Sequence, residues 1–371
     1  MSSQLVILTH EFYPKRGGIA VYTEETARAA CDLGWETTVW APEHEALTNK
    51  DFPFAVRKVG IKGNLGWGDR KTMMWQIMQE ARPFESSTVI LTEPGPILAA
   101  MYLNAMGKLP FGKFSVVLHG SEILRFCRLR YRRELFGALL NHADKIGVVS
   151  RFTKKLLLRY YPFLGPKTVI VSGGLRTDFQ PTSPAKPEKD TCTVLSLGRI
   201  HPRKGLHCLI EAVDHLPADV KSKICLSFVG PITDKNYLEK LKQMAKTSAC
   251  RIEFPGPIED ERLPEAYAAA DIFTLTSLRA GPSVEGFGMV CIEAGATGLP
   301  VIANRSGGIP EAVRHGKTGL IVSPRDRRDL AKAIQSLVED QELRQRLGKA
   351  GVARAAELSW ASNAEALVGK P

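Results

Sequence analysis

Glu285 and Glu293 are two carboxylates that one elongated, hydroxyl-rich ligand could contact. Glu285 follows the strand-like run Ile272 to Thr276, and Glu293 lies eight positions later, inside an apolar helical run. Ionised carboxylates accept hydrogen bonds from hydroxyl groups, so Glu285 could bind a sugar and Glu293 a ribose. Such a spacing is common by chance. An unpaired carboxylate in an apolar helix would nevertheless be costly to bury, which favours a binding site.

The start of the same helix offers backbone N–H groups to a phosphate or a sugar. Helix N-termini bind anions through these groups, and glycine lets the ligand come close because no side chain intervenes. The residues predicted to bind in this way are Gly286, Phe287, Gly288, Met289 and Val290.

Arg199 and Lys204 lie in a loop between the strand-like run Thr193 to Leu197 and a helix that begins at Leu206. A guanidinium and an ammonium can hold a diphosphate, and each charge-assisted bond contributes about 1.5 to 3 kcal/mol. These bonds strengthen as a leaving diphosphate gains charge, so the two cations could replace a metal ion. The sequence has no Asp-x-Asp motif, and we expect neither a metal nor a cofactor. A solvated basic loop is the alternative interpretation.

Two further candidates lie in the first half of the chain. Gly17 and Gly18 open a helix after the strand-like run Leu5 to Thr9, and His119 ends the apolar run Phe114 to Leu118. Paired glycines let a ligand approach the backbone, and an imidazole at the carboxyl end of a strand can hydrogen-bond a substrate hydroxyl. A ligand-free turn and a structural histidine are the respective alternatives.

The elements that must position these residues alternate between short apolar runs and helical patterns. This order is expected when parallel strands are joined by crossover helices. The strand candidates are Leu5 to Thr9, Thr37 to Trp40, Thr88 to Thr92, Phe114 to Leu118, Lys145 to Val149, Thr168 to Val171, Thr193 to Leu197, Ile224 to Val229, Arg251 to Phe254, Ile272 to Thr276, Pro300 to Ala303 and Gly319 to Val322. We predict an α/β fold of two Rossmann-like, doubly wound parallel sheets that face an interdomain cleft. Ligands of such sheets bind at the carboxyl ends of the strands.

The length of 371 residues suits two domains of this kind. Residues 1–180 are predicted to form the N-terminal domain, and residues 191–357 the C-terminal domain. The Pro-rich stretch 181–190 reads as a linker because it has no apolar periodicity. Residues 358–371 are amphipathic, and we expect them to pack back on the N-terminal domain.

The composition favours a cytoplasmic protein with anionic partners. The formal net charge is +11, and no apolar run approaches the about 20 residues of a membrane-spanning helix. The seven cysteines are scattered, as expected of reduced core thiols.

Part of the positive charge is interleaved with aromatic and aliphatic residues in two segments. The basic residues are Arg125, Arg128, Arg130, Arg132, Arg133, Lys154, Lys155 and Arg159. This mixture suits an anionic membrane surface, so the protein could be peripheral at the inner face of a membrane. The alternative is that both segments are amphipathic helices with their apolar sides in the core.

The candidates taken together resemble the retaining glycosyltransferases of family 4, also called glycosyl transferases group 1, which have the GT-B fold. The similarity spans nearly the whole chain and is strongest over residues 193–323. The matching residues, in family order, are Gly17, Gly18, His119, Gly120, Gly198, Arg199, Lys204, Gly205, the segment Glu285 to Glu293, Gly307, Gly308, Pro310 and Glu311.

The resemblance implies an enzyme that transfers a hexose from a nucleotide sugar to a glycan, a glycolipid or another hydroxyl. Arg199 and Lys204 would hold the donor diphosphate, Glu285 the sugar and Glu293 the ribose. The base would lie near Gly256 to Ile258, with Pro257 between them, and backbone groups would largely hold it. Retention is ascribed to attack on the front face of the sugar, with the leaving phosphate taking the acceptor proton.

Further implied contacts place His119 beside the transferred sugar and Gly17 and Gly18 on the acceptor side, with Gly18 also near the donor. Ile258 would border the base. One departure is that family members commonly have Asn-Gly-Val-Asp where this chain has Gly173 to Arg176. Arg176 therefore adds a cation that the family pattern does not include.

The sequence leaves the substrates open. UDP and GDP donors are both compatible, with UDP favoured, and the basic first half suggests a lipid-linked or cell-envelope glycan as acceptor. A sugar-nucleotide epimerase of the GT-B fold is the nearest alternative enzyme. A basic nucleic-acid-binding protein is an alternative from another class, but its module signatures are missing from the sequence.

Overall fold

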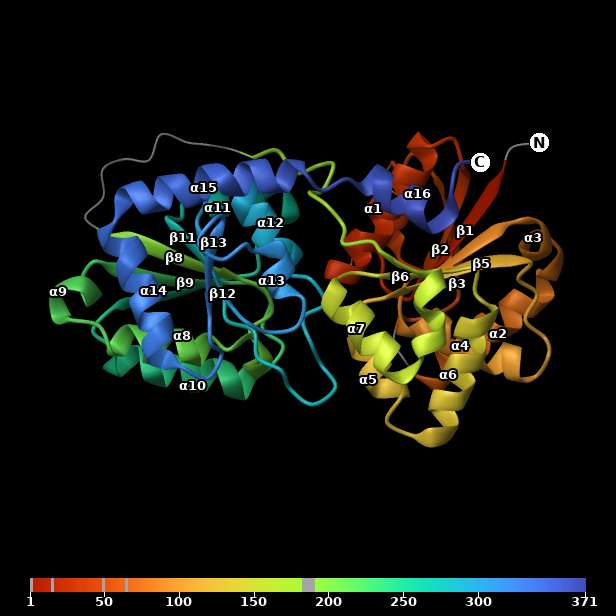
Figure 1. Cartoon of the computed structure of the whole chain (residues 1–371), viewed down its shortest axis with the longest axis horizontal. Coiled ribbons are helices and arrows are strands. Elements are labelled where there is room, and N and C mark those ends of the chain that lie inside the picture. The colour runs from red at the N-terminus through yellow and green to blue at the C-terminus, as the bar shows by residue number, and fades with distance from the viewer. Residues whose placement is uncertain (1–2, 15–16, 49–50, 64–65, 182–190) are drawn as a thin grey trace. The chain divides into compact units, whose positions relative to one another are not determined.

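The computed structural model describes residues 3–14, 17–48, 51–63, 66–181 and 191–371, and these form two compact units. The first unit contains residues 1–173 and 359–371, and the second contains residues 174–358. Each unit is built on one parallel sheet with helices on both faces (Figure 1). The prediction of two Rossmann-like α/β domains is confirmed.

The first sheet has seven parallel strands in the order β3-β2-β1-β4-β5-β6-β7. Its strands are β1 (Gln4–Leu8), β2 (Glu36–Pro42), β3 (Ala55–Val59), β4 (Thr88–Leu91), β5 (Lys113–Leu118), β6 (Lys145–Val148) and β7 (Thr168–Ile170). Sequence reasoning missed β3. It is an edge strand that buries only Val59 fully, so it lacks the apolar run that marks the central strands.

Helices cover both faces of the first sheet. They are α1 (Gly18–Asp32), α2 (Trp67–Gln79), α3 (Ala81–Ser86), α4 (Pro94–Ala105), α5 (Ser121–Phe126), α6 (Arg130–His142), α7 (Arg151–Tyr160) and α16 (Trp360–Val368). Right-handed crossovers place α1 on one face and α2, α4 and α6 on the other, because the chain moves across the sheet in opposite directions in the two cases. The helices α2, α4 and α6 are neighbours in one layer (Figure 1).

The C-terminal helix α16 packs with α1 against the first sheet. The Trp360 ring lies edge-on to Tyr22, with 5.2 Å between ring centroids, and the Ser115 hydroxyl donates to the Leu367 carbonyl at 2.8 Å. Gly173 makes room for this helix, because a Cβ there would come 2.9 Å from the Trp360 ring. The last residues of the chain thus complete the core of the first unit.

The second sheet has six parallel strands in the order β10-β9-β8-β11-β12-β13. Its strands are β8 (Cys192–Leu197), β9 (Ile224–Val229), β10 (Arg251–Gly256), β11 (Ile272–Leu275), β12 (Val301–Asn304) and β13 (Gly319–Val322). Its helices are α8 (Leu206–Asp214), α9 (Ala218–Lys221), α10 (Lys235–Thr247), α11 (Leu263–Ala268), α12 (Met289–Ala296), α13 (Ile309–Ala312), α14 (Arg327–Glu339) and α15 (Gln341–Ala356). Every strand predicted in this half is present, with ends within two residues of the prediction.

The second unit begins at Gly174, earlier than the boundary at residue 180 that the sequence suggested. Arg176 explains the shift: its guanidinium donates to both carboxylate oxygens of Asp178 and, at 3.0 Å, to Asp260. The Phe179 ring also packs edge-on against Tyr267. Residues 174–179 are therefore held by the second unit. Of the predicted linker, residues 182–190 lie outside the described chain.

Both sheets have a topological switch point, where the chain reverses its direction of travel across the sheet. In the second sheet the chain moves from β8 to β9 and β10, then returns to β11 on the other side of β8. Loops that follow the strands on either side of such a point diverge and leave a crevice for a ligand. The loops after β8 and β11 are therefore where a site is expected. No helix within the described residues is long and apolar enough to cross a membrane.

Candidate functional site

Glu285 is held by two cations at the switch point of the second sheet. The loop after β8 supplies Arg203 and Lys204, and the loop after β11 supplies Ser277 and Glu285. Arg203 Nη1 lies 3.1 Å from Glu285 Oε2, while Lys204 Nζ pairs with Oε1. The Ser277 hydroxyl donates to the same Oε1 at 3.0 Å. The structure thus brings Lys204 and Glu285 together, and it adds two partners that sequence reasoning did not identify.

The charge of this cluster is set by its cations. Burial by itself would raise the pKa of Glu285, but the positive charges of Lys204 and Arg203 lower it to about 2. The three charged side chains are only 12 to 16% exposed, so water screens them less than it would surface ions. Glu285 is therefore ionised at neutral pH, and the cluster carries one net positive charge.

Hydrogen bonds to backbone carbonyls fix the loops that carry the cluster. The Thr276 hydroxyl donates to the Lys204 carbonyl at 2.9 Å, and the Asn304 side-chain amide donates to the Thr276 carbonyl at 2.7 Å. The Gly308 N–H donates to the Glu285 carbonyl at 2.9 Å. Loops after β8, β11 and β12, which are neighbouring strands, are thus joined at one edge of the sheet. This explains why the glycines that follow β12 belong to the same site.

Gly307, directly before Gly308, has no room for a side chain, and this yields a prediction. It has φ +58°, and a Cβ there would lie 2.0 Å from the Glu285 carbonyl oxygen. Gly316 has a similar φ of +71° with nothing within 4 Å, so Gly316→Ala should cost only the about 1 to 2 kcal/mol of a left-handed alanine. Gly307→Ala should cost more, because the new Cβ also collides with the Glu285 carbonyl, and should lower the free energy of unfolding by about 3 kcal/mol or more in total. Urea denaturation of both variants checks this, and equal losses would show that the loop yields freely.

The N-terminus of α12 faces the loop that carries Glu285. Gly288 precedes the helix with φ +97°, and no side chain caps the first turn. Gly286, Met289 and Val290 are partly exposed, and their predicted backbone contacts with a ligand remain predictions. The Phe287 side chain is buried, which leaves only its backbone for a ligand. An uncapped helix start of this kind favours an anion.

Glu293 lies within α12, and its side chain is buried but paired. The Tyr267 hydroxyl, from α11, donates to Glu293 Oε2 at 2.7 Å. Burial raises the pKa of Glu293, and the hydrogen bond from Tyr267 and the charge of Arg176 oppose this rise. Sequence reasoning noted that the carboxylate needed a partner but could not identify Tyr267, 26 residues earlier.

The remaining predicted donor residues lie on the loops after β8 and β10. Arg199 is exposed, and the cation that pairs with Glu285 beside Lys204 is Arg203 instead. Pro257 is exposed and Ile258 is partly buried, directly after β10. All three are accessible at the carboxyl edge of the second sheet. Their predicted contacts with a diphosphate and a base remain predictions.

His119 lies at the carboxyl edge of the first sheet, directly after β5. Its Nε2 is 2.9 Å from the Thr92 carbonyl oxygen and donates a hydrogen bond to it. The ring also lies edge-on to Tyr22, 5.2 Å between centroids. Gly120 follows with φ +112°. These contacts fix the ring orientation at a strand end.

Gly17 and Gly18 lie at the start of α1, in the loop that follows β1. Both are exposed, and no side chain caps the helix. The strands β1, β4 and β5 are neighbours, so this loop and His119 lie at the same edge of the first sheet. The intervening Lys15 and Arg16 lie outside the described residues. In the parts of the chain that the structure does describe, no three His, Cys, Asp or Glu side chains are grouped so that they could hold a metal ion.

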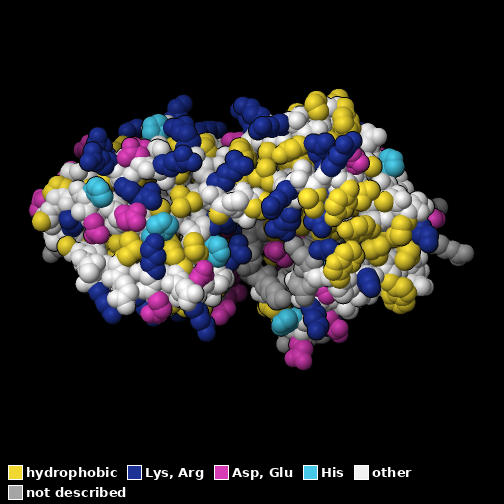
Figure 2. Space-filling model, turned by 90° about the horizontal axis from the view of Figure 1, so that it is seen from below, with side chains coloured by type: hydrophobic (Ala, Val, Ile, Leu, Met, Phe, Trp, Pro, Cys, Tyr) yellow, Lys and Arg dark blue, Asp and Glu magenta, His cyan; other side chains and the backbone are white. Residues whose placement is uncertain are grey.

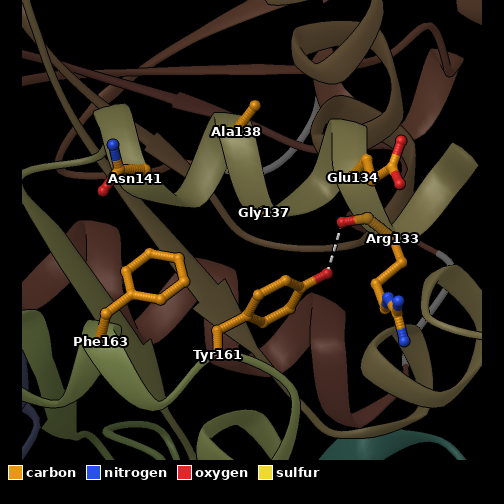
Figure 3. A pocket seen from close by; sticks show the side chains of 7 residues that line it. All are labelled: Arg133, Glu134, Gly137, Ala138, Asn141, Tyr161 and Phe163. Carbon is orange, nitrogen blue, oxygen red and sulfur yellow. Dashed lines mark hydrogen bonds between the residues drawn. The ribbon is translucent and has the colours of Figure 1, made fainter. Parts of the chain in front are cut away.

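A surface hollow of about 410 Å³ lies elsewhere on the first unit, between α6 and the turn Pro162–Lys167 (Figure 3). The rings of Tyr161 and Phe163 face α6, and the Tyr161 hydroxyl donates to the Arg133 carbonyl at 2.6 Å. Gly137 allows this approach, because a Cβ there would come 2.7 Å from the Tyr161 ring. None of the predicted site residues lines this hollow.

The two-sheet architecture matches known structures. Over 98% of this chain and 97% of the other, it aligns with the crystal structure of HepE from Anabaena in complex with UDP and glucose, with a TM-score of 0.78 and 20% sequence identity. The fold is therefore GT-B, the fold of nucleotide-sugar glycosyltransferases.

Sequence comparisons define the family. The model of Glycosyltransferase Family 4 matches residues 16–179, and that of Glycosyl transferases group 1 matches residues 178–354. A GDP-mannose-dependent alpha-(1-6)-phosphatidylinositol monomannoside mannosyltransferase from Mycolicibacterium smegmatis is 30% identical over 94% of this chain and 92% of its own. A D-inositol 3-phosphate glycosyltransferase from Corynebacterium glutamicum is 32% identical over 67% of this chain and 59% of its own. This chain belongs to glycosyltransferase family 4, and it is a glycosyltransferase.

Proposed function

We propose that this enzyme transfers a hexose, with retention of configuration, from a nucleoside diphosphate sugar to a hydroxyl group. The observation that carries the proposal is the pairing of Glu285 with Lys204 and Arg203 at the switch point of the second sheet. Two cations face one carboxylate, so the cluster keeps one net positive charge. The helix α12, which starts just after Glu285, has no side-chain cap. A diphosphate fits this surplus, and a sugar attached to it would lie within reach of Glu285.

Donor binding would exchange partners within the cluster. The diphosphate attracts Lys204, together with Arg203 or Arg199, and this leaves Glu285 oxygens available to accept hydrogen bonds from the sugar. The cations then stabilise the charge that develops as the bond between the anomeric carbon and the phosphate oxygen breaks. The acceptor oxygen bonds to the same face of the anomeric carbon, and its proton passes to the departing phosphate. No covalent nucleophile from the protein takes part.

The other predicted residues have supporting positions in this scheme. Glu293 would bind the ribose through Oε1, since Oε2 already accepts from Tyr267. Pro257 and Ile258 would border the base. On the first unit, His119 would accept a hydrogen bond from a hydroxyl at Nδ1, and Gly17 and Gly18 would line the acceptor.

The donor and acceptor can be narrowed by the named relatives. The sequence leaves UDP and GDP open, and the relative that matches over nearly its full length is named as GDP-mannose-dependent. Both named relatives act on inositol-containing molecules by their names, one of them a lipid. We therefore infer GDP-mannose as the first donor to test, UDP-glucose as the second, and a lipid-linked polyol or glycan as the acceptor.

Incubation of the purified chain with each donor and phosphatidylinositol-type acceptors tests the proposal. The expected result is a glycosylated lipid whose anomeric configuration, measured by NMR, equals that of the donor. Inversion would disprove the front-face scheme. Conversion of the donor to an isomeric nucleotide sugar without acceptor would favour the epimerase alternative.

Metal independence yields a further prediction. Lys204 and Arg203 supply the positive charge beside the proposed phosphate site. Turnover in about 1 mM EDTA should therefore stay within about twofold of the untreated rate. The rate of product formation with and without chelator measures this. A loss of turnover that manganese restores would contradict the assignment.

A further inference from the structure

One face of the first unit carries a stripe of exposed apolar side chains on α2. Trp67, Lys71, Trp75 and Met78 follow one another at intervals of three or four residues, so they share one side of the helix. Trp67 is 62% exposed, Trp75 57% and Met78 39%. Amphipathic helices normally turn such residues into the core. Here Met73 and Ile77 are buried instead, and the tryptophans point to the solvent.

A second group of basic and exposed apolar residues lies around the start of α6, which belongs to the same helix layer as α2 and α4. Leu129 is 45% exposed and Tyr131 52%. The basic side chains around them are those of Arg125, Arg128, Arg130, Arg132 and Arg133. Figure 2 shows hydrophobic and Lys or Arg side chains intermixed over this unit, on the right of the view.

Cations lie against the exposed aromatic rings. The Arg70 guanidinium is 5.3 Å from the Trp67 ring centroid, and that of Arg132 is 5.6 Å from the Tyr131 ring centroid. The acidic Glu134 is paired with Arg130, so it offsets only one of the positive charges. The surface is therefore both apolar and positively charged.

The second basic segment suggested by the sequence, α7, does not share this property. Leu157 is buried, and Leu156 and Leu158 pack against the core of the first unit. The Lys154 ammonium donates to the Thr168 carbonyl at 2.8 Å. The alternative of an amphipathic helix that faces the core therefore holds for α7. It does not account for α2, whose largest side chains are exposed.

We propose that the surface formed by Trp67, Trp75 and Met78 of α2 and by Leu129 to Arg133, here called the tryptophan face, docks on a bilayer of anionic phospholipid. Tryptophan and tyrosine favour the membrane–water interface, where the ring meets acyl chains and the polar edge meets water. Basic residues near an anionic surface each add about 1 kcal/mol of attraction. The proposal rests on exposed side chains and charge, not on the transfer reaction, so each can fail without the other.

The tryptophans provide a direct signal for the test. Trp35, Trp40 and Trp360 are 7%, 3% and 8% exposed, so a change in tryptophan emission on docking reports Trp67 and Trp75. With vesicles of phosphatidylglycerol and phosphatidylcholine in equal parts, we expect a blue shift and co-sedimentation of the chain. With phosphatidylcholine alone, binding should be at least about tenfold weaker.

Two pairs of variants assign the effect to the tryptophan face. The double variant Trp67→Ser/Trp75→Ser should bind the anionic vesicles at least tenfold more weakly, whereas Val352→Ser, which removes a 45% exposed apolar side chain from α15, should bind as the parent does. Likewise Arg128→Gln/Arg133→Gln should weaken binding, whereas Lys332→Gln/Arg346→Gln removes two exposed charges from the second unit without effect. Far-UV circular dichroism checks that each variant is folded.

Several outcomes would overturn the proposal. One is that the emission does not shift with anionic vesicles, and another is that the double tryptophan variant binds as tightly as the parent. An emission shift that depends on protein concentration without lipid would mean that a second copy covers the face. If the parent and the double tryptophan variant bound RNA equally tightly, the surface would be a nucleic-acid surface instead.

Discussion

Replacing Glu285 with glutamine is expected to lower kcat by about 100-fold while nucleoside diphosphate affinity stays the same or increases. A hydrogen bond from a sugar hydroxyl to a charged carboxylate contributes about 1.5 to 3 kcal/mol, and glutamine provides only a weaker acceptor. In the ligand-free protein Glu285 also occupies Lys204 and Arg203. Glutamine would release both cations for the diphosphate. A loss of kcat without a loss of nucleotide affinity separates this role from a structural one.

Initial rates give kcat, and calorimetry with GDP and UDP gives the affinities. Glu342→Gln, an exposed carboxylate at the start of α15, is the matched control and should change neither quantity. Ser277→Ala keeps the Glu285 carboxylate and removes one hydrogen bond, so a severalfold loss of kcat is expected. If Glu285→Gln kept full turnover, or lost nucleotide binding in a folded protein, the sugar contact would be assigned to the wrong residue.

The sequence predicted the fold well because central parallel strands are buried on both faces. Such strands form short apolar runs that stand out between helical patterns. The edge strand β3 shows the limit, since only Val59 of its five residues is fully buried. The boundary of the second unit was predicted too late for a different reason. It depends on the ion pairs of Arg176 with Asp178 and Asp260, and Asp260 is 84 residues away in the chain.

The same distinction applies to the site. Lys204 and Glu285 follow strands β8 and β11, which the topology places side by side, so their proximity is a consequence of the fold. Which arginine pairs with Glu285, Arg199 or Arg203, does not follow from the fold. Gly205 has φ +67° and ends a tight turn at Pro202–Lys204, and the direction of each side chain depends on that turn. Spacing along the chain does not encode this direction, so Arg203 was overlooked.

Replacing Lys204 gives the second large expected effect. Lys204 pairs with Glu285 in the ligand-free protein, and in the proposed donor complex it binds the diphosphate. Lys204→Ala should weaken nucleoside diphosphate binding by about 10- to 150-fold, the equivalent of one charge-assisted bond of about 1.5 to 3 kcal/mol. It should lower kcat as well, because the leaving phosphate loses a cation. Calorimetry with GDP, and with guanosine as a control that lacks phosphate, separates this loss from damage to the fold. Unchanged GDP affinity would contradict a phosphate role for Lys204.

The pH profile of the Lys204→Ala variant distinguishes a lysine that sets the pKa of Glu285 from one that only stabilises the fold. Lys204 and Arg203 together hold the pKa of Glu285 at about 2, so removing one cation should raise that pKa. The acid limb of kcat/KM should then move to higher pH, because Glu285 would take up a proton earlier as the pH falls. Lys204→Arg keeps the charge and should keep the acid limb in place.

Comparing Arg199→Ala with Arg203→Ala by GDP calorimetry and by the pH profile of kcat/KM decides which arginine binds the diphosphate together with Lys204. Replacing the arginine that holds the phosphate should weaken GDP binding. Replacing an arginine that only balances the charge of Glu285 should shift the acid limb and leave GDP binding unchanged.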